Sequence, residues 1–130
     1  MILPQELIIG NYVFDIDGDV LQIGQILDIG VKFKNTSLSS RYEKIQPIPL
    51  TEEILLKFGF IRNKIKTISE VIDVSGNDKL LEFEVTEMGL DLWISSDKID
   101  EALYFPVNYI KYAHNLQNLY FALTGEELTF

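Results

Sequence analysis

The chain has 130 residues, of which 47% are hydrophobic and 24% charged, and this balance predicts one compact soluble domain rather than a disordered chain or two full domains. It contains no cysteine, which excludes disulfides, thiolate zinc sites and cysteine nucleophiles. The opening residues, MILPQELIIGNYV, have no basic segment before the apolar ones, and no later apolar run is long enough to span a membrane. We therefore expect a cytoplasmic protein.

The formal net charge of −9 comes from the second half of the sequence. Residues 1–66 carry eight basic and eight acidic side chains, whereas residues 67–130 carry three lysines and twelve acids. Because phosphate backbones repel an acidic surface, we expect no nonspecific nucleic-acid binding unless the neutral first half supplies a local basic face. The acidic half predicts either a solubilising surface, or one that docks onto a basic partner or mimics nucleic acid.

The first fifty residues have the pattern of a strand-rich module. Short runs rich in Ile and Val alternate with turn residues, at positions 7–14, 20–27 and 30–34. Asp17-Gly18 lies between two of these runs and is a strong hairpin signal, because a type I′ turn needs residues that tolerate left-handed conformations. We predict a meander that begins an SH3-like small β-barrel.

A short helix and a second set of strands are expected next. Thr51 is a suitable N-cap, Glu52 and Glu53 would lie in the first turn, where the helix dipole favours acids, and Gly59 would end the helix. From Thr67 onward apolar residues alternate with polar ones, which predicts an antiparallel β-meander that continues to Val107.

The clearest predicted element is a C-terminal amphipathic helix, which begins near Tyr109, with Asn108 as its cap, and ends at Gly125. We expect the helix to cover the second-half sheet with its apolar side and to present a polar stripe on its other side. The apolar side comprises Tyr109, Tyr112, Ala113, Leu116, Leu119, Tyr120 and Leu123, and the polar side comprises Lys111, His114, Asn115, Gln117 and Asn118. Amides with one imidazole occur at interfaces, around buried hydrogen-bond networks and on ordinary helices, so all three interpretations stay open.

The predicted fold class is therefore α+β. It combines an N-terminal SH3-like small β-barrel or meander, a short helix, an antiparallel β-meander and the C-terminal amphipathic helix. All of them are expected in a single compact domain, residues 1–130. Residues 1–50 would form the strand-rich module, and residues 51–130 would hold both helices and the second sheet.

Three stretches of this sequence carry a resemblance to a known family: LIIGNYV (Leu7–Val13), SSRYEKIQPIPLTEEILLKFGF (Ser39–Phe60) and YAHNLQNLYFALTGEEL (Tyr112–Leu128). Through them the chain resembles an uncharacterised family of short proteins encoded in phages and prophages of Bacteroides-type gut bacteria. The match covers the first sixty and the last twenty residues, while the residues between them match only in general character. The resemblance implies phage biology in the cytoplasm of a bacterial host, and it implies no activity, cofactor or catalytic residue.

The sequence offers little support for catalysis. Asp15, Asp17 and Asp19 resemble the start of a calcium loop, but Gly18 is misplaced and Ile26 stands where a bidentate glutamate is required, so a hairpin turn is the better interpretation. The chain has no Gly-x-Ser-x-Gly elbow and no phosphate-cradling glycine loop. We predict no enzyme, no catalytic residue, no cofactor and no metal site.

An enzymatic alternative depends on carboxylates of the second half. Glu82, Glu84, Glu87 and Asp91 could crowd one side of a hairpin, as a metal-dependent phosphodiesterase would need. The simpler explanation is that alternate residues of a half-buried strand are polar.

Candidate ligand-binding residues lie in two segments. In NTSLSSRYEK, hydroxyls accompany Arg41, Tyr42 and Lys44, groups suited to binding a phosphate and stacking on a base. In the C-terminal helix the candidates are His114, Asn115 and Asn118. The alternative for the first segment is a solvated loop whose Arg41 pairs with a neighbouring acid.

These features favour a non-enzymatic, phage-encoded binding protein that antagonises or modulates a host component. Its sharpest form is a host-defence inhibitor that sequesters a small nucleotide-like signal in a preformed pocket at a subunit junction of a homo-oligomer. The alternatives are an acidic protein that docks onto a host protein or mimics nucleic acid, the metal-dependent phosphodiesterase, and a structural accessory of the phage.

Overall fold

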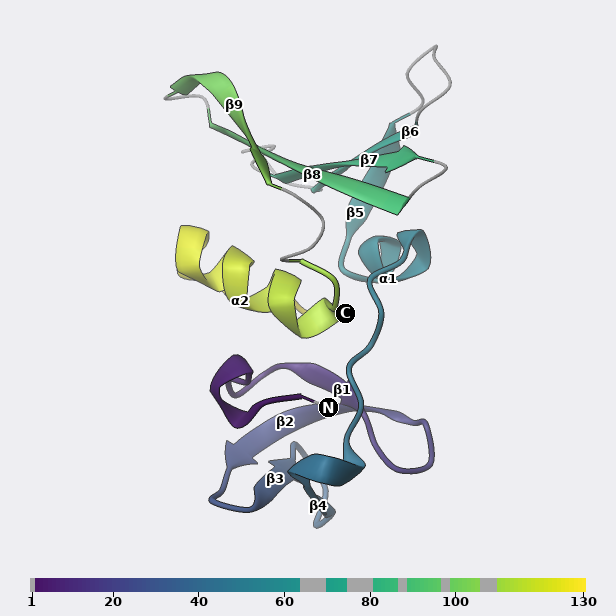
Figure 1. Ribbon diagram of the computed structural model, residues 1–130, viewed down its shortest axis with the longest axis vertical. Coiled ribbons are helices and arrows are strands. Elements are labelled where there is room, and N and C mark those ends of the chain that lie inside the picture. The colour runs from purple at the N-terminus through teal and green to yellow at the C-terminus, as the bar shows by residue number, and fades with distance from the viewer. Residues whose placement is uncertain (1, 64–69, 75–80, 87–88, 97–98, 106–109) are drawn as a thin grey trace. The chain divides into compact units, whose positions relative to one another are not determined.

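The computed structural model describes residues 2–63, 70–74, 81–86, 89–96, 99–105 and 110–130 (Figure 1). The fold is α+β, as predicted. Its contacts divide the chain into two compact units. Unit 1 comprises Met1–Pro49 and Lys111–Thr129, and unit 2 comprises Leu50–Ile110 and Phe130. No helix within the described ranges is long and apolar enough to cross a membrane.

Unit 1 is built on an antiparallel meander of four strands in the order β1-β2-β3-β4. The strands are β1 (Tyr12–Phe14), β2 (Val20–Ile26), β3 (Gly30–Phe33) and β4 (Ser39–Arg41). A 3-10 helix precedes them, η1 (Pro4–Glu6), and another follows, η2 (Tyr42–Lys44). The meander curls, because two backbone hydrogen bonds of 2.9 and 3.0 Å join Gln46, beyond η2, to Phe14 in β1. The core inside this curl includes Val13, Ile23 and Val31, all fully buried.

The hairpin predicted at Asp17-Gly18 is confirmed. Gly18 has a φ of +82°, a conformation that suits glycine, and Phe14 pairs with Val20 across the hairpin. The predicted strand at 7–14 is shorter than expected, because a turn closed by the Asn11 N–H and the Ile8 carbonyl (3.2 Å) occupies the residues before Tyr12.

The C-terminal helix, α2 (Ala113–Thr124), lies in unit 1. It begins later than predicted, because Tyr112 is extended and bridges to Pro49, and the Ala113 N–H donates to the Ile48 carbonyl (2.9 Å). The proposed cap Asn108 and its neighbour Tyr109 are outside the described residues. The predicted end is confirmed by the left-handed Gly125 (φ +76°). The helix thus groups with residues 2–49, whereas we expected it to group with residues 51–130.

Unit 2 contains α1 (Glu52–Lys57) and a five-stranded antiparallel sheet in the order β5-β6-β7-β8-β9. Its strands are β5 (Phe60–Asn63), β6 (Glu70–Val74), β7 (Leu81–Thr86), β8 (Gly89–Ser96) and β9 (Ile99–Phe105). The predicted cap is confirmed, since Thr51 Oγ1 accepts a hydrogen bond from the Ile54 N–H (3.3 Å). The sheet follows the predicted meander and adds β5 before it. Val107, where we expected the meander to end, is outside the described residues.

Candidate functional site

The polar side of α2 packs into unit 1 instead of facing solvent. His114 and Gln117 are buried, while Phe121 and Leu123 are exposed. The polar stripe predicted from the sequence is therefore buried at these two residues. The reason is that backbone N–H and C=O groups of residues 6–12 and of Leu128 take hydrogen bonds from polar side chains of α2 or give hydrogen bonds to them.

Gln117 joins three segments of unit 1 through its amide. Its Oε1 accepts a hydrogen bond from the Tyr12 N–H (2.9 Å), and its Nε2 donates to the carbonyls of Gly10 (3.0 Å) and Leu128 (2.8 Å). Both ends of this buried amide are thus used within the protein, so Gln117 is a structural residue. The sequence placed it in the polar stripe but gave no sign of its partners.

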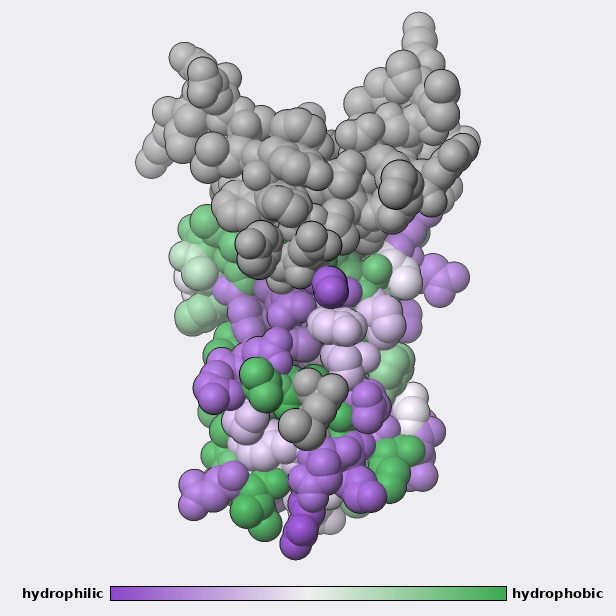
Figure 2. Space-filling view, in the orientation of Figure 1, coloured by the Kyte–Doolittle hydropathy of each residue, from purple (hydrophilic) through white to green (hydrophobic). Residues whose placement is uncertain are grey.

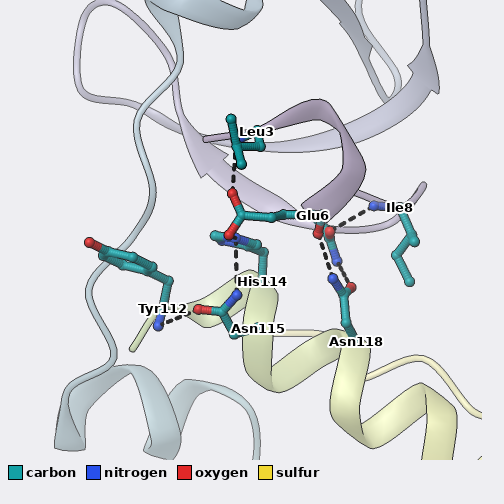
Figure 3. Close-up of polar contacts among 8 residues, drawn as sticks. Leu3, Glu6, Ile8, Tyr112, His114, Asn115 and Asn118 are labelled. Carbon is teal, nitrogen blue, oxygen red and sulfur yellow. Dashed lines mark hydrogen bonds and ion pairs between the residues drawn. The ribbon is translucent and has the colours of Figure 1, made fainter. Parts of the chain in front are cut away.

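Asn118, a predicted ligand residue, makes a similar structural contact (Figure 3). Its Oδ1 accepts from Asn11 Nδ2 (2.9 Å), and its Nδ2 donates to the Glu6 carbonyl (2.6 Å). Asn11 in turn accepts from the Ile8 N–H (2.9 Å). Of the three interpretations left open for this stripe, the structure shows the buried hydrogen-bond network, which holds the N-terminal segment on α2.

His114, the second predicted ligand residue, is only 1% exposed. Its Nε2 lies 3.3 Å from Asn115 Nδ2 and 3.9 Å from Glu6 Oε1 (Figure 3). Its Nδ1 is buried and has no hydrogen-bond partner among the described residues. Burial lowers the pKa of His114 below 6.5, and the Glu6 carboxylate opposes this shift only in part. The imidazole is therefore neutral at pH 7 and has almost no surface that a ligand can touch.

Asn115, the third candidate in α2, supports the start of the helix. Its Oδ1 accepts a hydrogen bond from the Tyr112 N–H (3.1 Å), and the Tyr112 ring stacks on His114 with 5.8 Å between the ring centroids. An asparagine three residues into a helix satisfies a backbone N–H at its N-terminus in this way. All three α2 candidates thus have partners within unit 1.

Arg41 is the last residue of β4, and Tyr42 and Lys44 belong to η2, which follows directly. Within unit 1, β4 lies at the end opposite α2 (Figure 1). Tyr42 is a buried core residue whose hydroxyl donates to the Leu27 carbonyl, so its ring has no free face on which a base could stack. The Arg41 side chain is 68% exposed, and its Nη1 lies 3.8 Å from Glu43 Oε1. Glu43 is thus the neighbouring acid with which Arg41 pairs if this segment is a solvated loop. Lys44 is exposed. The structure therefore does not bring the six predicted residues into one pocket.

An open hollow of about 250 Å³ lies beside β4. Its lining combines aliphatic side chains, two hydroxyls and a guanidinium, from Leu27, Ile29, Gly30, Val31, Ser39, Ser40 and Arg41. Leu27 is 39% exposed and Ile29 is 66% exposed. Figure 2 shows hydrophobic patches among hydrophilic side chains at this end of unit 1. A hollow of this volume is at the lower end of the range of small-molecule pockets and can take one side chain of a partner.

Gly30 permits the close approach of β3 and β4 beside this hollow. A Cβ atom at this position would overlap the carbonyl oxygen of Ser40 and come within 2.8 Å of the Arg41 Cα. Because both of these are backbone atoms, they cannot move aside as a flexible side chain would. Glycine is therefore required here for steric reasons.

The β3–β4 hairpin carries a local positive charge that the balanced composition of the first half conceals. Residues 30–44 contain one acid, Glu43, and four exposed basic residues, Lys32, Lys34, Arg41 and Lys44. The acids that balance them in the sequence are elsewhere, for example in the β1–β2 turn. Unit 1 thus has the local basic face that the neutral composition of the first half allowed but did not show.

Asp15, Asp17 and Asp19 form the turn of the β1–β2 hairpin. One oxygen of the Asp15 carboxylate accepts hydrogen bonds from the N–H groups of Asp17 and Asp19, both at 2.9 Å. The three carboxylates come within 4.8 Å of one another at the surface. The turn itself explains this arrangement, as the sequence interpretation expects.

Strand register in unit 2 relates the acidic residues of the enzymatic alternative to one another. Glu82 is opposite Asp73 in β6 and Trp93 in β8, and Glu84 is opposite Asp91. Because alternate residues of a strand share a face, Asp73, Glu82, Glu84 and Asp91 are on the same face of the unit 2 sheet. Glu87 is outside the described residues.

No match was found when the chain was compared with protein-family models, with curated proteins and with solved structures. The resemblance to phage-encoded proteins accordingly stays a prediction.

Proposed function

We propose that this chain is a non-enzymatic binding protein that holds its partner at the end of unit 1 formed by β3 and β4. The contact area, which we term the β4 surface, comprises Leu27, Ile29, Lys32, Ser39, Ser40 and Arg41. The observation that carries the proposal is the Arg41 guanidinium, which is 68% exposed and lines a hollow together with aliphatic side chains and hydroxyls. Arg is enriched in the well-packed centres of protein interfaces, and a neighbouring apolar pocket is their usual companion.

The ion pair between Arg41 and Glu43 leaves the guanidinium available to a partner. Both side chains are more than half exposed and their atoms are 3.8 Å apart. Such a surface pair contributes less than about 1 kcal/mol, so a carboxylate or phosphate of a partner can replace Glu43 at little cost. A role of this kind needs no nucleophile, general base or metal.

A nucleotide-like ligand, the sharpest form of the sequence hypothesis, would place its phosphate against Arg41 and Lys44. The exposed cations support this form, whereas the burial of Tyr42 and the small volume of the hollow favour a protein partner. The proposed setting is the cytoplasm of a phage-infected bacterium, where the protein would antagonise a host component. This setting, and a homo-oligomeric state, are supported by sequence features alone.

The proposal extends to the finer fold of unit 1, which we assign to the SH3-like barrels. Two features support the assignment: the 3-10 helix η2 directly after β4, and the hydrogen bonds that return Gln46 to β1. Since one fold hosts many functions, the assignment adds no functional argument of its own.

The test is affinity capture from extracts of a Bacteroides-type host by the wild type and two charge-reversal variants. Arg41→Glu should lose the stoichiometric partner, and Lys111→Glu, a matched change at an exposed residue before α2, should keep it. Calorimetry with cyclic dinucleotides and ADP-ribose derivatives provides a second arm, in which heat that depends on Arg41 would identify a nucleotide ligand. Equal capture by wild type and Arg41→Glu, with no heat in calorimetry, would refute the role of the β4 surface.

A second candidate function is favoured by the register of the unit 2 sheet. Four acids share one face of that sheet, which supports docking onto a basic partner through the acidic half of the chain. The double variant Glu82→Lys/Glu84→Lys should then lose its partner, while Glu126→Lys, a change at an exposed acid in unit 1, should not. Retention of the partner by the double variant would exclude this function.

A further inference from the structure

The last strand of the unit 1 sheet presents one backbone edge that β3 does not use. β4 is at the end of the strand order and pairs with β3 in the register Gly30↔Arg41, Val31↔Ser40 and Lys32↔Ser39. Flanking hydrogen bonds run from the Phe33 N–H to the Leu38 carbonyl (3.0 Å) and from the Tyr42 N–H to the Ile29 carbonyl (3.3 Å).

These two bonds fix the direction of the backbone groups in β4. In an antiparallel ladder, hydrogen-bonded residues alternate along each strand, so residues 38, 40 and 42 direct their groups toward β3. The N–H and C=O groups of Ser39 and Arg41 consequently point away from β3. The Arg41 carbonyl also accepts a long hydrogen bond from Ser40 Oγ (3.4 Å), which leaves its second lone pair for a partner. An added strand bonds to these outward-pointing residues, which are every second residue of β4, so β4 can hold a short extended segment.

The side chains around this edge are suited to the side chains of such a segment. Leu27 and Ile29, both partly exposed, line the hollow beside β4 and can take an aliphatic group. Arg41 and Lys32 are exposed, and the register places Ser39 opposite Lys32 and Arg41 opposite Gly30 on the same face of the hairpin. An acidic residue paired with Arg41 in the added strand would lie beside the guanidinium, whereas Lys32 would be one strand further away, across β4.

The charge and aromatic content of the hairpin favour an acidic peptide over a nucleic acid. Single-stranded nucleic acids bind through exposed aromatic rings on which bases stack. The two aromatic residues between Gly30 and Lys44 are Phe33 and Tyr42, and both are buried. The exposed hairpin therefore offers cations, aliphatic groups and a strand edge, but no ring for stacking.

We propose that an extended segment of a partner protein, in which an acidic residue is next to an aliphatic one, adds to β4 as a further antiparallel or parallel strand. The inference rests on the proposed function and specifies how the β4 surface binds. Backbone hydrogen bonds to Ser39 and Arg41 supply a sequence-independent part of the affinity. The hollow and the guanidinium select the side chains.

The experiment is a titration of the ¹⁵N-labelled full chain with the peptide acetyl-Val-Glu-Val-Glu-Val-amide, followed by NMR. Weak binding is expected, with the largest amide shifts at Ser39 and Arg41. Arg41→Glu should weaken the affinity roughly tenfold or more, and Lys111→Glu should change it less than about twofold. Two further peptides carry N-methyl groups at alternate residues, one at odd and one at even positions, and so lack the backbone N–H donors there. The peptide whose methyl groups face β4 should not bind. A Val-Lys peptide and an oligothymidine serve as charge and class controls.

The outcomes separate the inference from the proposed function. If N-methylated and unmodified peptides bind equally and both depend on Arg41, the β4 surface is a binding site but strand addition is wrong. If the oligothymidine shifts Ser39 and Arg41 and the Val-Glu peptide does not, the partner class is wrong. Absence of any Val-Glu peptide binding at millimolar concentration overturns the inference, whereas the capture experiment decides the proposed function independently.

Discussion

The Nε2 atom of His114 lies 3.9 Å from Oε1 of Glu6, so the buried face of α2 contacts the N-terminal 3-10 helix, η1, at this pair of residues. The Glu6 carboxylate also accepts a hydrogen bond from the Leu3 N–H (2.8 Å). The backbone carbonyl of Glu6 accepts a hydrogen bond from Asn118, so the side chain and the backbone of Glu6 together order the N-terminal segment. The imidazole is buried and neutral beside this carboxylate.

This arrangement predicts a loss of stability on mild acidification. Burial lowers the pKa of His114 in the folded chain below its unfolded value of 6.5. The unfolded chain therefore takes up a proton first, and stability that is fully present above pH 6.5 is lost as the pH falls toward the folded pKa. Urea denaturation at pH 7.5 and 5.5 should show a lower midpoint at the lower pH. Because His114 is the only histidine, His114→Gln should remove most of the difference. A wild-type midpoint that is unchanged or higher at pH 5.5 would contradict the prediction.

Removal of the Gln117 amide should destabilise unit 1. Gln117→Ala leaves the Tyr12 N–H and the carbonyls of Gly10 and Leu128 without this partner in a buried place. The expected cost is about 2–4 kcal/mol in the free energy of unfolding, measured by urea denaturation. Gln25→Ala, the same change at an exposed position of β2, should cost less than about 0.5 kcal/mol. Similar costs for both variants would show that the network contributes little.

A methyl group at position 30 should disturb the β3–β4 hairpin. In Gly30→Ala the new Cβ overlaps the Ser40 carbonyl oxygen, so the strands must separate, at an expected cost of about 1–3 kcal/mol. Ser39→Ala, a change at an exposed residue of the same hairpin, should leave stability nearly unchanged. Thermal unfolding compares the two, and amide spectra locate the change. If Gly30→Ala melts at the wild-type temperature, the steric role assigned to this glycine is wrong.

The N-cap of α1 should contribute measurably to unit 2, because this helix has only six residues. Thr51→Ala removes the acceptor for the Ile54 N–H and should cost about 1 kcal/mol. Thr51→Ser keeps a hydroxyl and should restore most of that stability, which distinguishes capping from loss of the methyl group. Equal destabilisation by the alanine and serine variants would refute the capping contribution.

Local features of this fold could be predicted well from sequence. The Asp17-Gly18 turn, the Thr51 cap and the left-handed Gly125 all follow from conformational preferences of one or two residues and their nearest neighbours. The start of α2 could not be predicted so well, because the pairing of Tyr112 with Pro49 competes with helix formation and connects residues far apart in the chain.

The candidate site could be predicted only in part. Arg41 and Lys44 are exposed as the sequence suggests, whereas Tyr42 belongs to the core and the three α2 candidates have partners within unit 1. The local charge of the β3–β4 hairpin was present in the sequence as a run of four basic residues and one acid, but the balanced total for residues 1–66 concealed it.

The sequence by itself determined the α+β class, the turns and caps, and the division of α2 into an apolar and a polar side. Only the tertiary structure decided that polar residues of α2 are buried. The physical reason is that all but one of the partners named for Gln117 and Asn118 are backbone and amide groups more than a hundred residues earlier in the chain, as for Gln117 and Gly10, which are 107 positions apart. Helical periodicity shows which residues share a face, but burial of that face depends on which unsatisfied groups the rest of the chain brings to it.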